Sequence, residues 1–366
     1  MNWPTSIFLI STFILALTAM PAYAFFYGID WYQWTVFFGL FIATGLSVTL
    51  GYHRLYSHRA FQAKWPVRLF VLLFGAASFE GSAISWVSDH RYHHKHVDHD
   101  EDPYDIRKGF FHAHIGWLLV KLQPVRSLDN VKDLLSDPLC RWQNKYMVPL
   151  AFLVGFGLPT ALGALHAGWI GALGGFLVGG VTRVVAVQQM TFFINSLCHM
   201  VGDQPYSFRC TARDSWIMAL FTFGEGYHNF HHEFQHDYRN GVKPWQWDPT
   251  KWTIWLLNRI GLASNLRRVP AERILLAELV AAQSKINSHL SRISAQESMC
   301  RIAAAWHECL RQVAASLSAY REELSSAIDE KKRLSQEALH TIRQELQLAL
   351  AQLKLDMKLD VGRMAS

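Results

Sequence analysis

The chain has 366 residues, of which 51% are apolar and only 17% are charged. Soluble proteins usually carry about a quarter charged residues, so this composition argues against an ordinary soluble protein. The mean hydropathy of +0.07 is nevertheless too low for a chain that is entirely transmembrane, so apolar spans must alternate with long polar segments. The net charge of +6 comes without a basic patch interleaved with aromatic residues, which argues against a nucleic-acid partner. The five cysteines form no CxxC pair and indicate neither a disulfide framework nor a metal–thiolate site.

Two apolar segments at the N-terminus are each long enough to cross a membrane. Residues 1–28 and residues 31–53 contain no Asp, Glu, Lys or Arg, and each run exceeds the ~20 residues that a spanning helix needs. Ala22-Tyr23-Ala24 resembles the cleavage site of a secretory signal. A signal peptide, however, normally has Lys or Arg before its apolar run, and here there is none. We therefore expect residues 1–52 to form two transmembrane helices.

A third apolar region covers residues 146–202, where Arg183 is the single charged side chain. It is long enough for two helices that turn near residues 166–168, so we expect residues 147–199 to hold two further spans. A charge inside a span costs at least ~2.5 kcal/mol and usually faces a cavity, so we interpret Arg183 as support for a cavity wall. The expected fold is therefore all-α, with a four-helix transmembrane bundle and a helical cap.

The polar segments determine the orientation in the membrane. Residues 67–79 are apolar but too short to span, so we expect an interfacial or packed helix there. Residues 53–146 and 200–265 then lie on one side of the membrane, and with the tail they hold nearly all the Lys and Arg. The positive-inside rule makes that side cytoplasmic, together with both termini. The short N-terminus and the lack of an endoplasmic-reticulum signal favour a bacterial inner membrane.

Residues 266–366 are expected to form a helical tail. No Pro or Gly occurs between Pro270 and Gly362, and charges of both signs are intermixed. An apolar stripe runs along its last part at helical spacing, and its members are Leu339, Ile342, Leu346, Leu350, Leu353 and Met357. Two interpretations stay open, a helix pair that folds back on the domain, or a coiled coil that forms a homodimer or docks a partner.

Four short histidine clusters lie on the deduced cytoplasmic side. They are His53-Arg54-Leu55-Tyr56-Ser57-His58, His90-Arg91-Tyr92-His93-His94, Asn195-Ser196-Leu197-Cys198-His199 and His228-Asn229-Phe230-His231-His232. Positions i, i+3 and i+4 share one face of a helix, so the second and fourth clusters each present three imidazoles toward one point. Asn195 and His199 share a face for the same reason. Together the clusters supply nine imidazoles.

Nine imidazoles are too many for one metal ion, and two ions with four or five ligands each fit better. Neutral imidazole binds Zn, Fe, Cu and Ni, and a nearly all-nitrogen set that leaves room for oxygen favours a di-iron redox centre. The other nine histidines are interpreted as ordinary surface or packed side chains: His96, His99, His112, His114, His166, His236, His289, His307 and His340.

The order HRLYSH, HRYHH, NSLCH and GEGYHNFHH across residues 53–232 resembles the membrane-bound fatty-acyl desaturases, in particular their acyl-coenzyme A delta-9 (stearoyl-type) branch. Further matches between these clusters are Asp102-Pro103, Gly109-Phe110-Phe111 with His114, Gly116-Trp117-Leu118-Leu119 and Gly224-Glu225-Gly226-Tyr227. The resemblance covers about residues 5–260, and the tail has no counterpart in it.

The resemblance implies two iron ions and assigns a ligand set to each. One iron would be held by His53, His58, His90, His94 and His231. The other would be held by His93, His199, His228 and His232, with Asn195 reaching it through a water molecule. No residues beyond these metal ligands are assigned a catalytic role.

The implied reaction removes two hydrogens from adjacent methylenes of a saturated acyl chain, with O₂ as co-substrate and two electrons from an outside donor. The chain contains no HPGG-like haem motif. We therefore expect the donor to be a separate protein, either cytochrome b5-like or of the ferredoxin or rubredoxin type with its reductase.

The acyl carrier stays open. In the acyl-coenzyme A branch, polar residues near the second cluster and beyond the GWLL segment hold the coenzyme A group, and Asp89 and Lys121 match that pattern. Ser88 and Leu122 stand where a basic residue is expected, and Phe192 stands where that branch has Trp. An acyl group on a membrane lipid or on acyl carrier protein is therefore an alternative to acyl-coenzyme A.

The depth of a substrate tunnel can be sought on the second span, which carries His53 at its cytoplasmic end. Phe41 and Gly45 lie about three and two turns before His53 and are candidates for the tunnel floor. The alternative is that both simply pack helices, a common role of Gly in membranes.

Three other functions are alternatives to a desaturase. A di-iron hydroxylase of lipids, alkanes or sterols would share the histidine clusters, but the NSLCH and GEGYHNFHH forms favour a desaturase. A metal- or haem-binding membrane protein would need polar ligands near the bilayer midplane or paired axial histidines on facing spans, whereas the clusters lie at span ends and in loops. A purely structural scaffold does not account for nine clustered histidines.

Overall fold

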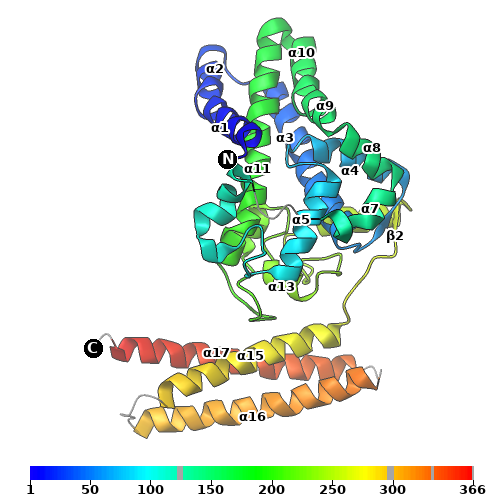
Figure 1. The fold of residues 1–366 in the computed structure, drawn as a ribbon. Coiled ribbons are helices and arrows are strands. Elements are labelled where there is room, and N and C mark those ends of the chain that lie inside the picture. The colour runs from blue at the N-terminus through cyan, green and yellow to red at the C-terminus, as the bar shows by residue number, and fades with distance from the viewer. Residues whose placement is uncertain (122–126, 295–300, 331–333, 365–366) are drawn as a thin grey trace. The chain divides into compact units, whose positions relative to one another are not determined.

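The computed structural model describes residues 1–121, 127–294, 301–330 and 334–364. Leu122 and the side chains of His307 and Met357 lie outside this description. The chain divides into two compact units, residues 1–203 with 210–268, and residues 204–209 with 269–366. As expected, almost all the regular secondary structure of the described chain is helical (Figure 1). Its one described sheet is an antiparallel ladder in which β1 (Gln62–Ala63) pairs with β2 (Ala263–Ser264).

The first unit begins with two apolar helical segments long enough to cross a membrane, Trp3–Tyr27 and Trp31–Ser57. The first consists of α1 (Trp3–Leu17) and α2 (Ala19–Tyr27), and the second of α3 (Trp31–Leu46) and the π-helical segment η1 (Ser47–Ser57). A capping box starts α3, because Asp30 Oδ1 accepts from the Gln33 amide at 2.8 Å while Gln33 Oε1 accepts from the Asp30 amide at 3.0 Å.

The third apolar helix, Met147–His199, reverses direction within its length. Ala167 and Gly168 have non-helical backbone angles, with φ of +59° at Gly168, and this reversal lies where the sequence predicts a turn. On either side of it Gly163 and Gly171 face each other so closely that a Cβ on one would lie 2.0–2.2 Å from the carbonyl oxygen of the other. The region therefore forms two antiparallel arms, although the number of membrane spans stays a prediction.

The arms contain several helical segments in succession. They are α9 (Met147–Phe152), η5 (Leu153–Gly157), α10 (Leu158–Gly174), η6 (Gly175–Thr182), α11 (Arg183–Asn195) and η7 (Leu197–His199). The fully buried Arg183 donates to the carbonyl oxygens of Gly179 at 3.2 Å, Ala77 at 2.7 Å and Gly155 at 2.7 Å. These three carbonyls are partners that the sequence did not identify, and they tie the arms to the end of a neighbouring helix.

That neighbour is α4 (Trp65–Ala76), the short apolar helix expected to lie flat or packed. Its Val71 and Leu72 are buried in the main core of the unit together with Leu50 and Tyr52 of η1. The polar segments add further short elements, namely α5 (Ala83–His96), η2 (Ile106–Lys108), η3 (His112–Gly116), α6 (Trp117–Leu119), η4 (Leu128–Val131), α7 (Lys132–Ser136), α8 (Pro138–Lys145), α12 (Trp216–Phe221), α13 (His228–Glu233) and α14 (Pro249–Arg259).

The second unit contains three long helices, α15 (Ala271–Ser294), α16 (Arg301–Asp329) and α17 (Gln336–Met364). They enclose their own apolar core, whose buried members include Leu275, Leu317 and Leu346. The predicted apolar stripe of the tail contributes to this core through Leu339, Ile342, Leu346, Leu350 and Leu353. The stripe is thus covered by helices of the same chain, so a homodimer would have to use a different surface.

Candidate metal centre

The nine clustered histidines come from four elements of the first unit. His53 belongs to η1 and His58 follows its end, α5 carries His90, His93 and His94, η7 carries His199, and α13 carries His228, His231 and His232. The π-helical winding of η1 explains the HxxxxH spacing of the first cluster. The His58 amide donates to the His53 carbonyl oxygen at 3.1 Å, an i to i+5 hydrogen bond, and this winding places both rings on one side of the segment.

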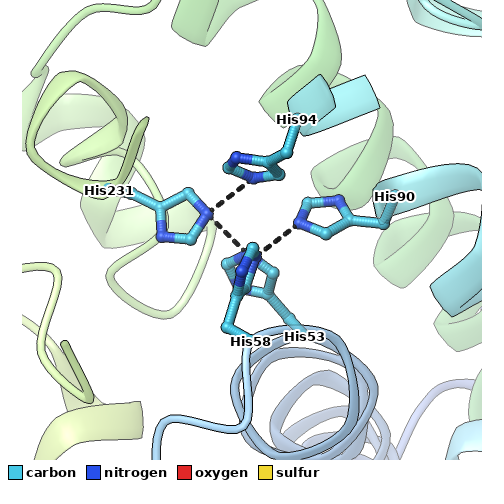
Figure 2. Close-up of side chains that lie close together, drawn as sticks. All are labelled: His53, His58, His90, His94 and His231. Atoms are coloured by element: carbon cyan, nitrogen blue, oxygen red, sulfur yellow. Dashed lines mark hydrogen bonds between the residues drawn. The ribbon is translucent and has the colours of Figure 1, made fainter. Parts of the chain in front are cut away.

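Five of the rings converge on one point, as Figure 2 shows. The group comprises His53, His58, His90, His94 and His231, and its ring nitrogens lie within 4.8 Å of one another. The Nε2 atom of His231 lies 2.9 Å from that of His53 and 3.0 Å from that of His94. The Nε2 atoms of His58 and His90 are 2.8 Å apart. We call these residues the five-histidine group.

The remaining four rings form a second group beside the first. It comprises His93, His199, His228 and His232, whose ring nitrogens also lie within 4.8 Å of one another. The Nε2 atom of His228 is 3.1 Å from that of His199 and 3.1 Å from that of His232. His93 and His232 are 3.4 Å apart at Nε2. These four residues are called the four-histidine group, and both groups coincide with the sets that the sequence resemblance implies.

These spacings fit metal coordination. A first-row metal ion sits about 2.0–2.1 Å from an imidazole nitrogen, so neighbouring ligands at right angles lie about 3 Å apart and opposite ligands about 4.2 Å apart. The Nε2 separations of 2.8–3.4 Å correspond to neighbouring ligands of this kind. The donor set therefore fits two metal ions, and imidazole nitrogen suits iron among others.

The second ring nitrogen of several histidines is held by an oxygen. Glu225 Oε2 lies 2.8 Å from Nδ1 of His53, and Asp102 Oδ1 lies 2.9 Å from Nδ1 of His93. The Thr211 hydroxyl lies 2.8 Å from Nδ1 of His199 and donates to Asp98 at 2.7 Å. An oxygen at Nδ1 favours the tautomer that carries its proton there, which leaves the Nε2 lone pair free for a metal.

Glu225 is itself fixed by a buried ion network. The Arg54 guanidinium, 1% exposed, donates to Glu225 at 2.8 Å and to Asp248 at 3.1 Å. Asn240 Nδ2 donates to the other Glu225 oxygen. Burial raises the pKa of the Glu225 carboxyl, but Arg54 and His53 outweigh it and hold this pKa below its ordinary value. The carboxylate therefore stays charged as the partner of His53.

The burial of the rings also sets their charge. Burial, and then the neighbouring imidazoles, lower the pKa well below the ordinary value of histidine for six rings: His58, His90, His94, His228, His231 and His232. Neutral imidazoles keep a lone pair, so the groups are suited to bind metal at neutral pH.

A cavity reaches the five-histidine group between helices α1, α5 and α11. Its wall includes His53 and His90, and its other walls are largely apolar, with Phe8, Val48 and Phe192 among them. Asn195, at the end of α11, and Asp89, on α5, also line it, whereas Lys121 is exposed. The cavity thus places three of the predicted site residues, Asp89, Phe192 and Asn195, beside His53 and His90.

Phe41 and Gly45 are not among the residues that line this cavity. The Phe41 ring lies 5.5 Å from the ring of Phe223, and a Cβ on Gly45 would lie 2.3 Å from that same ring. Within the described structure both therefore pack against Phe223, and the helix reaches the cavity through Val48 and Thr49 instead. Ser88 is buried and donates to Asn130 at 2.8 Å.

Glu80 and Phe79 are two of several cavity residues that the sequence did not identify. Glu80 accepts a hydrogen bond from Trp86 Nε1 at 3.2 Å, and burial raises the pKa of its carboxyl to about 8, which keeps this wall of the cavity largely uncharged at neutral pH. Phe79 has a left-handed backbone, with φ of +58°. Its ring stacks on Phe8 at 4.7 Å and on Phe156 at 4.8 Å. A lone acid after an apolar helix was the only signal available for Glu80.

Several other histidines have partners away from the metal groups. His166 lies 2.7 Å from Asp30 at the turn between the two arms, far along the chain from the clusters. His114 lies 3.0 Å from both Gln189 Oε1 and Ser196 Oγ. Their interpretation as packed or surface side chains agrees with these contacts.

Comparison with known proteins gives a consistent picture. A family model described as fatty acid desaturase matches residues 29–253. An acyl-CoA desaturase 1 of Saccharomyces cerevisiae is 45% identical over 253 residues, which are 68% of this chain and 49% of the yeast protein. A stearoyl-CoA desaturase 5 of Bos taurus is 36% identical over 64% of this chain and 71% of its own length. An sn-1 stearoyl-lipid 9-desaturase of Anabaena variabilis is 37% identical over 73% of this chain and 94% of its own length. The chain spans about half the length of the yeast relatives that it matches.

Proposed function

Because the chain belongs to the fatty acid desaturase family, we propose that it introduces a cis double bond, at the delta-9 position, into a saturated acyl chain. The observation that carries this proposal is the pair of adjacent histidine groups at the end of an apolar cavity. The reaction is an oxidation in which O₂ takes four electrons, two from the acyl chain and two from an external donor, and leaves as two water molecules.

Two iron ions are the proposed cofactors. The five-histidine group would hold one, and the four-histidine group would hold the other, with Asn195 as a ligand through water. When bound, the irons supply the oxidising power that O₂ needs to take hydrogens from unactivated methylenes. The chain's own contribution is to orient the rings, since Glu225, Asp102 and Thr211 hold Nδ1 of three of them.

The cavity is the proposed acyl-chain site. Its apolar walls favour a hydrocarbon chain over water, and His53 and His90 at its wall place that chain beside the five-histidine group. Phe192 on the same wall contributes apolar contact. The tunnel-floor role of Phe41 and Gly45 gains no support from their packing on Phe223.

The carrier is proposed to be acyl-coenzyme A, with an acyl-lipid or an acyl carrier protein as alternatives. Asp89 on the cavity wall and the exposed Lys121 would face its polar end. The two yeast relatives named acyl-CoA desaturase are 45% and 44% identical to this chain, which favours acyl-coenzyme A. The stearoyl-lipid desaturase of Anabaena variabilis is 37% identical and covers more of this chain, which keeps the lipid carrier as an alternative.

The chain is an integral membrane protein, and we propose four spans with the metal groups and both termini on the cytoplasmic side. Two contacts support this arrangement. The Asn2 amide donates to the carbonyl oxygen of Leu119 at 2.8 Å, which places the N-terminus beside the polar segment 53–146. At the other end of the helices Asp30 meets His166. A bacterial inner membrane fits the proposal.

The proposed partners are an external electron donor, of the cytochrome b5 or the ferredoxin or rubredoxin type, and a second copy of the chain, through a surface of the tail other than its covered apolar stripe. The reaction supports the need for a donor, because two of the four electrons that reduce O₂ do not come from the acyl chain.

Expression in a bacterial strain that makes no unsaturated fatty acids tests the function. We expect monounsaturated chains in its lipids by gas chromatography with mass spectrometry, and we expect none from the His93→Ala or His228→Ala variants, each of which removes one ligand. Immunoblots of the membrane fraction control for insertion. Recovery of hydroxylated chains without an alkene would contradict the proposal in favour of a hydroxylase.

A further inference from the structure

A second hollow reaches the five-histidine group through two rings that the apolar cavity does not touch. We call it the basic pocket, and it is lined by Ser57, His58, Arg59, Arg91, His94, Lys95, Gln235 and His236. Among these described residues three are Arg or Lys and none is Asp or Glu. It shares no lining residue with the cavity. His58 and His94 are therefore accessible from a positively charged surface while the cavity approaches His53 and His90.

The positive charges of the basic pocket are held in place by the local fold. Arg91, 17% exposed, donates to the carbonyl oxygens of Tyr56 at 2.7 Å and Ser57 at 3.1 Å, and pairs with Asp133 at 2.8 Å. Arg59 also pairs with Asp133, yet its side chain stays 57% exposed. Lys95 is exposed and directly follows His94. One carboxylate thus offsets three cations, and the surface keeps a net positive charge.

Two features connect this surface to His58. Arg59, the next residue, has a left-handed backbone with φ of +50°, a conformation that a residue with a Cβ rarely adopts and that recurs at functional sites. The exposed His236 donates through Nδ1 to the carbonyl oxygen of His58 at 2.9 Å. A hydrogen bond therefore runs from a solvent-facing ring to the backbone of a proposed iron ligand.

From these features we infer that the basic pocket is the docking site of the electron donor, and that this donor is a separate one-electron carrier protein with an acidic surface. The inference rests on the proposed function. During turnover an acyl chain fills the apolar cavity, so electrons need another route, and the basic pocket is a described surface that ends on rings of the five-histidine group. Charge complementarity speeds such brief encounters and orients the partner.

The electron balance fixes how often the donor must dock. Each reduced carrier gives up one electron and is oxidised, so two carriers supply two electrons per cycle. The acyl chain loses two hydrogens as two electrons and two protons, and O₂ takes up four electrons and four protons, the other two protons coming from water. The product is one C=C bond and two water molecules.

Charge reversal in the full-length, iron-loaded protein in nanodiscs tests this docking site. The probes are two reduced acidic carriers, a soluble cytochrome b5 haem domain and a plant-type ferredoxin, whose oxidation is followed by stopped-flow absorbance at low and high salt. For Lys95→Glu and Arg59→Glu we expect oxidation of at least one carrier to slow by about tenfold or more at low salt and to lose most of its salt dependence. Lys95→Arg should retain the wild-type rate.

Arg141→Glu is the matched control, because Arg141 is an exposed cation of the same unit that does not line the basic pocket. Iron content and single-turnover alkene formation after reduction with dithionite should match the wild type in all four variants.

Two results would overturn the inference. One is that Lys95→Glu and the wild type oxidise the carriers at equal rates, and the other is that the wild type oxidises neither carrier. An effect of Lys95→Glu on binding to anionic lipid vesicles, with carrier oxidation unchanged, would also overturn it and assign the surface to lipid. Carrier oxidation without any alkene would contradict the proposed function and leave the docking site standing.

Discussion

The apolar cavity and the basic pocket approach the same five histidines and differ in almost every other respect. The cavity is walled by buried apolar side chains such as Val48 and Phe192, each 3% exposed. The basic pocket is walled by the exposed side chains of Arg59, Lys95 and His236. Among the described residues, its wall carries cations and no acid, whereas the cavity is lined by the three acids Glu80, Asp89 and Glu225, of which Glu80 is largely neutral because burial raises its pKa to about 8.

Under the proposed function, this contrast keeps the acyl chain and the electron donor on different sides of the five-histidine group. An apolar chain needs a dry wall, because water and charge beside it would cost the burial free energy that binds it. A transient protein partner needs the opposite, an exposed surface with a defined charge. The ring arrangement separates them, since His53 and His90 face the cavity and His58 and His94 face the basic pocket.

The largest effect is expected from removal of the His231 ring, which lies between the cavity and the basic pocket. His231 Nε2 lies 2.9 Å from His53, a cavity residue, and 3.0 Å from His94, a residue of the basic pocket. We expect His231→Ala to lose the iron of the five-histidine group and all detectable alkene, measured by mass-spectrometric iron analysis and lipid analysis. His340→Ala, on an exposed position of α17, is the control. Full iron content in His231→Ala would exclude this ring as a ligand.

The next largest effect is expected at Glu225, which holds the His53 ring on the cavity side of the five-histidine group. Glu225→Gln keeps the size of the side chain but removes the carboxylate beside His53 Nδ1 and one of the two carboxylates that pair with Arg54. We expect iron affinity or turnover to fall about 10- to 100-fold. Because the pKa of Glu225 is lowered in the folded protein, its contribution to stability is present above the unfolded pKa and is lost as the pH falls through the folded value.

Stability measured by thermal unfolding from pH 7 to pH values below 4.5, the ordinary pKa of Glu, should therefore decrease more for the wild type than for Glu225→Gln. Asp237→Asn offers a comparison, because Asp237 is also buried and pairs with an arginine but does not contact a histidine of either group in the described structure. If both variants lose iron equally, the effect belongs to folding and not to the orientation of His53.

The ligand histidines could be found from sequence because i, i+3 and i+4 spacing fixes a shared helix face for the clusters on α5 and α13. The residues that contact Nδ1 of these histidines could not be found in this way. Glu225 and His53, for example, are more than 170 residues apart in the sequence and meet only in the folded chain. The π-helical winding of η1 was equally hidden, because its i to i+5 bonds leave no periodic signature in so short a segment. The described members of the tail stripe lie in the core of the second unit, but sequence spacing alone does not say which helices cover them.

A smaller effect should show whether Phe79, or the second span with Phe41 and Gly45, limits the length of the acyl chain. Phe79 lines the cavity with a strained backbone, and its ring packs so closely on Gly155 that a Cβ there would lie 2.5 Å away. We expect Phe79→Leu to shift the product profile toward longer chains by shortening this wall. Gly45→Trp should instead displace Phe223 and lower stability. Two results would favour the second span as the limit on chain length. One is an unchanged distribution of product chain lengths in Phe79→Leu, and the other is shorter products from a stable Gly45→Trp protein.

The smallest effect on turnover should come from the second unit, because the described residues that line the two hollows all belong to the first unit. Leu317 is 1% exposed in the core of the three-helix bundle, so Leu317→Ala should destabilise that bundle by about 2–5 kcal/mol. Hydrogen exchange of α15–α17 in the full-length protein would detect the loss. Leu348→Ala, at a position 60% exposed on α17, should change stability by less than about 0.5 kcal/mol. Iron content and carrier oxidation should stay at the wild-type level in both variants, because the rings, the cavity and the basic pocket are all built from the first unit. A loss of carrier oxidation in Leu317→Ala alone would instead mean that the tail takes part in receiving the donor.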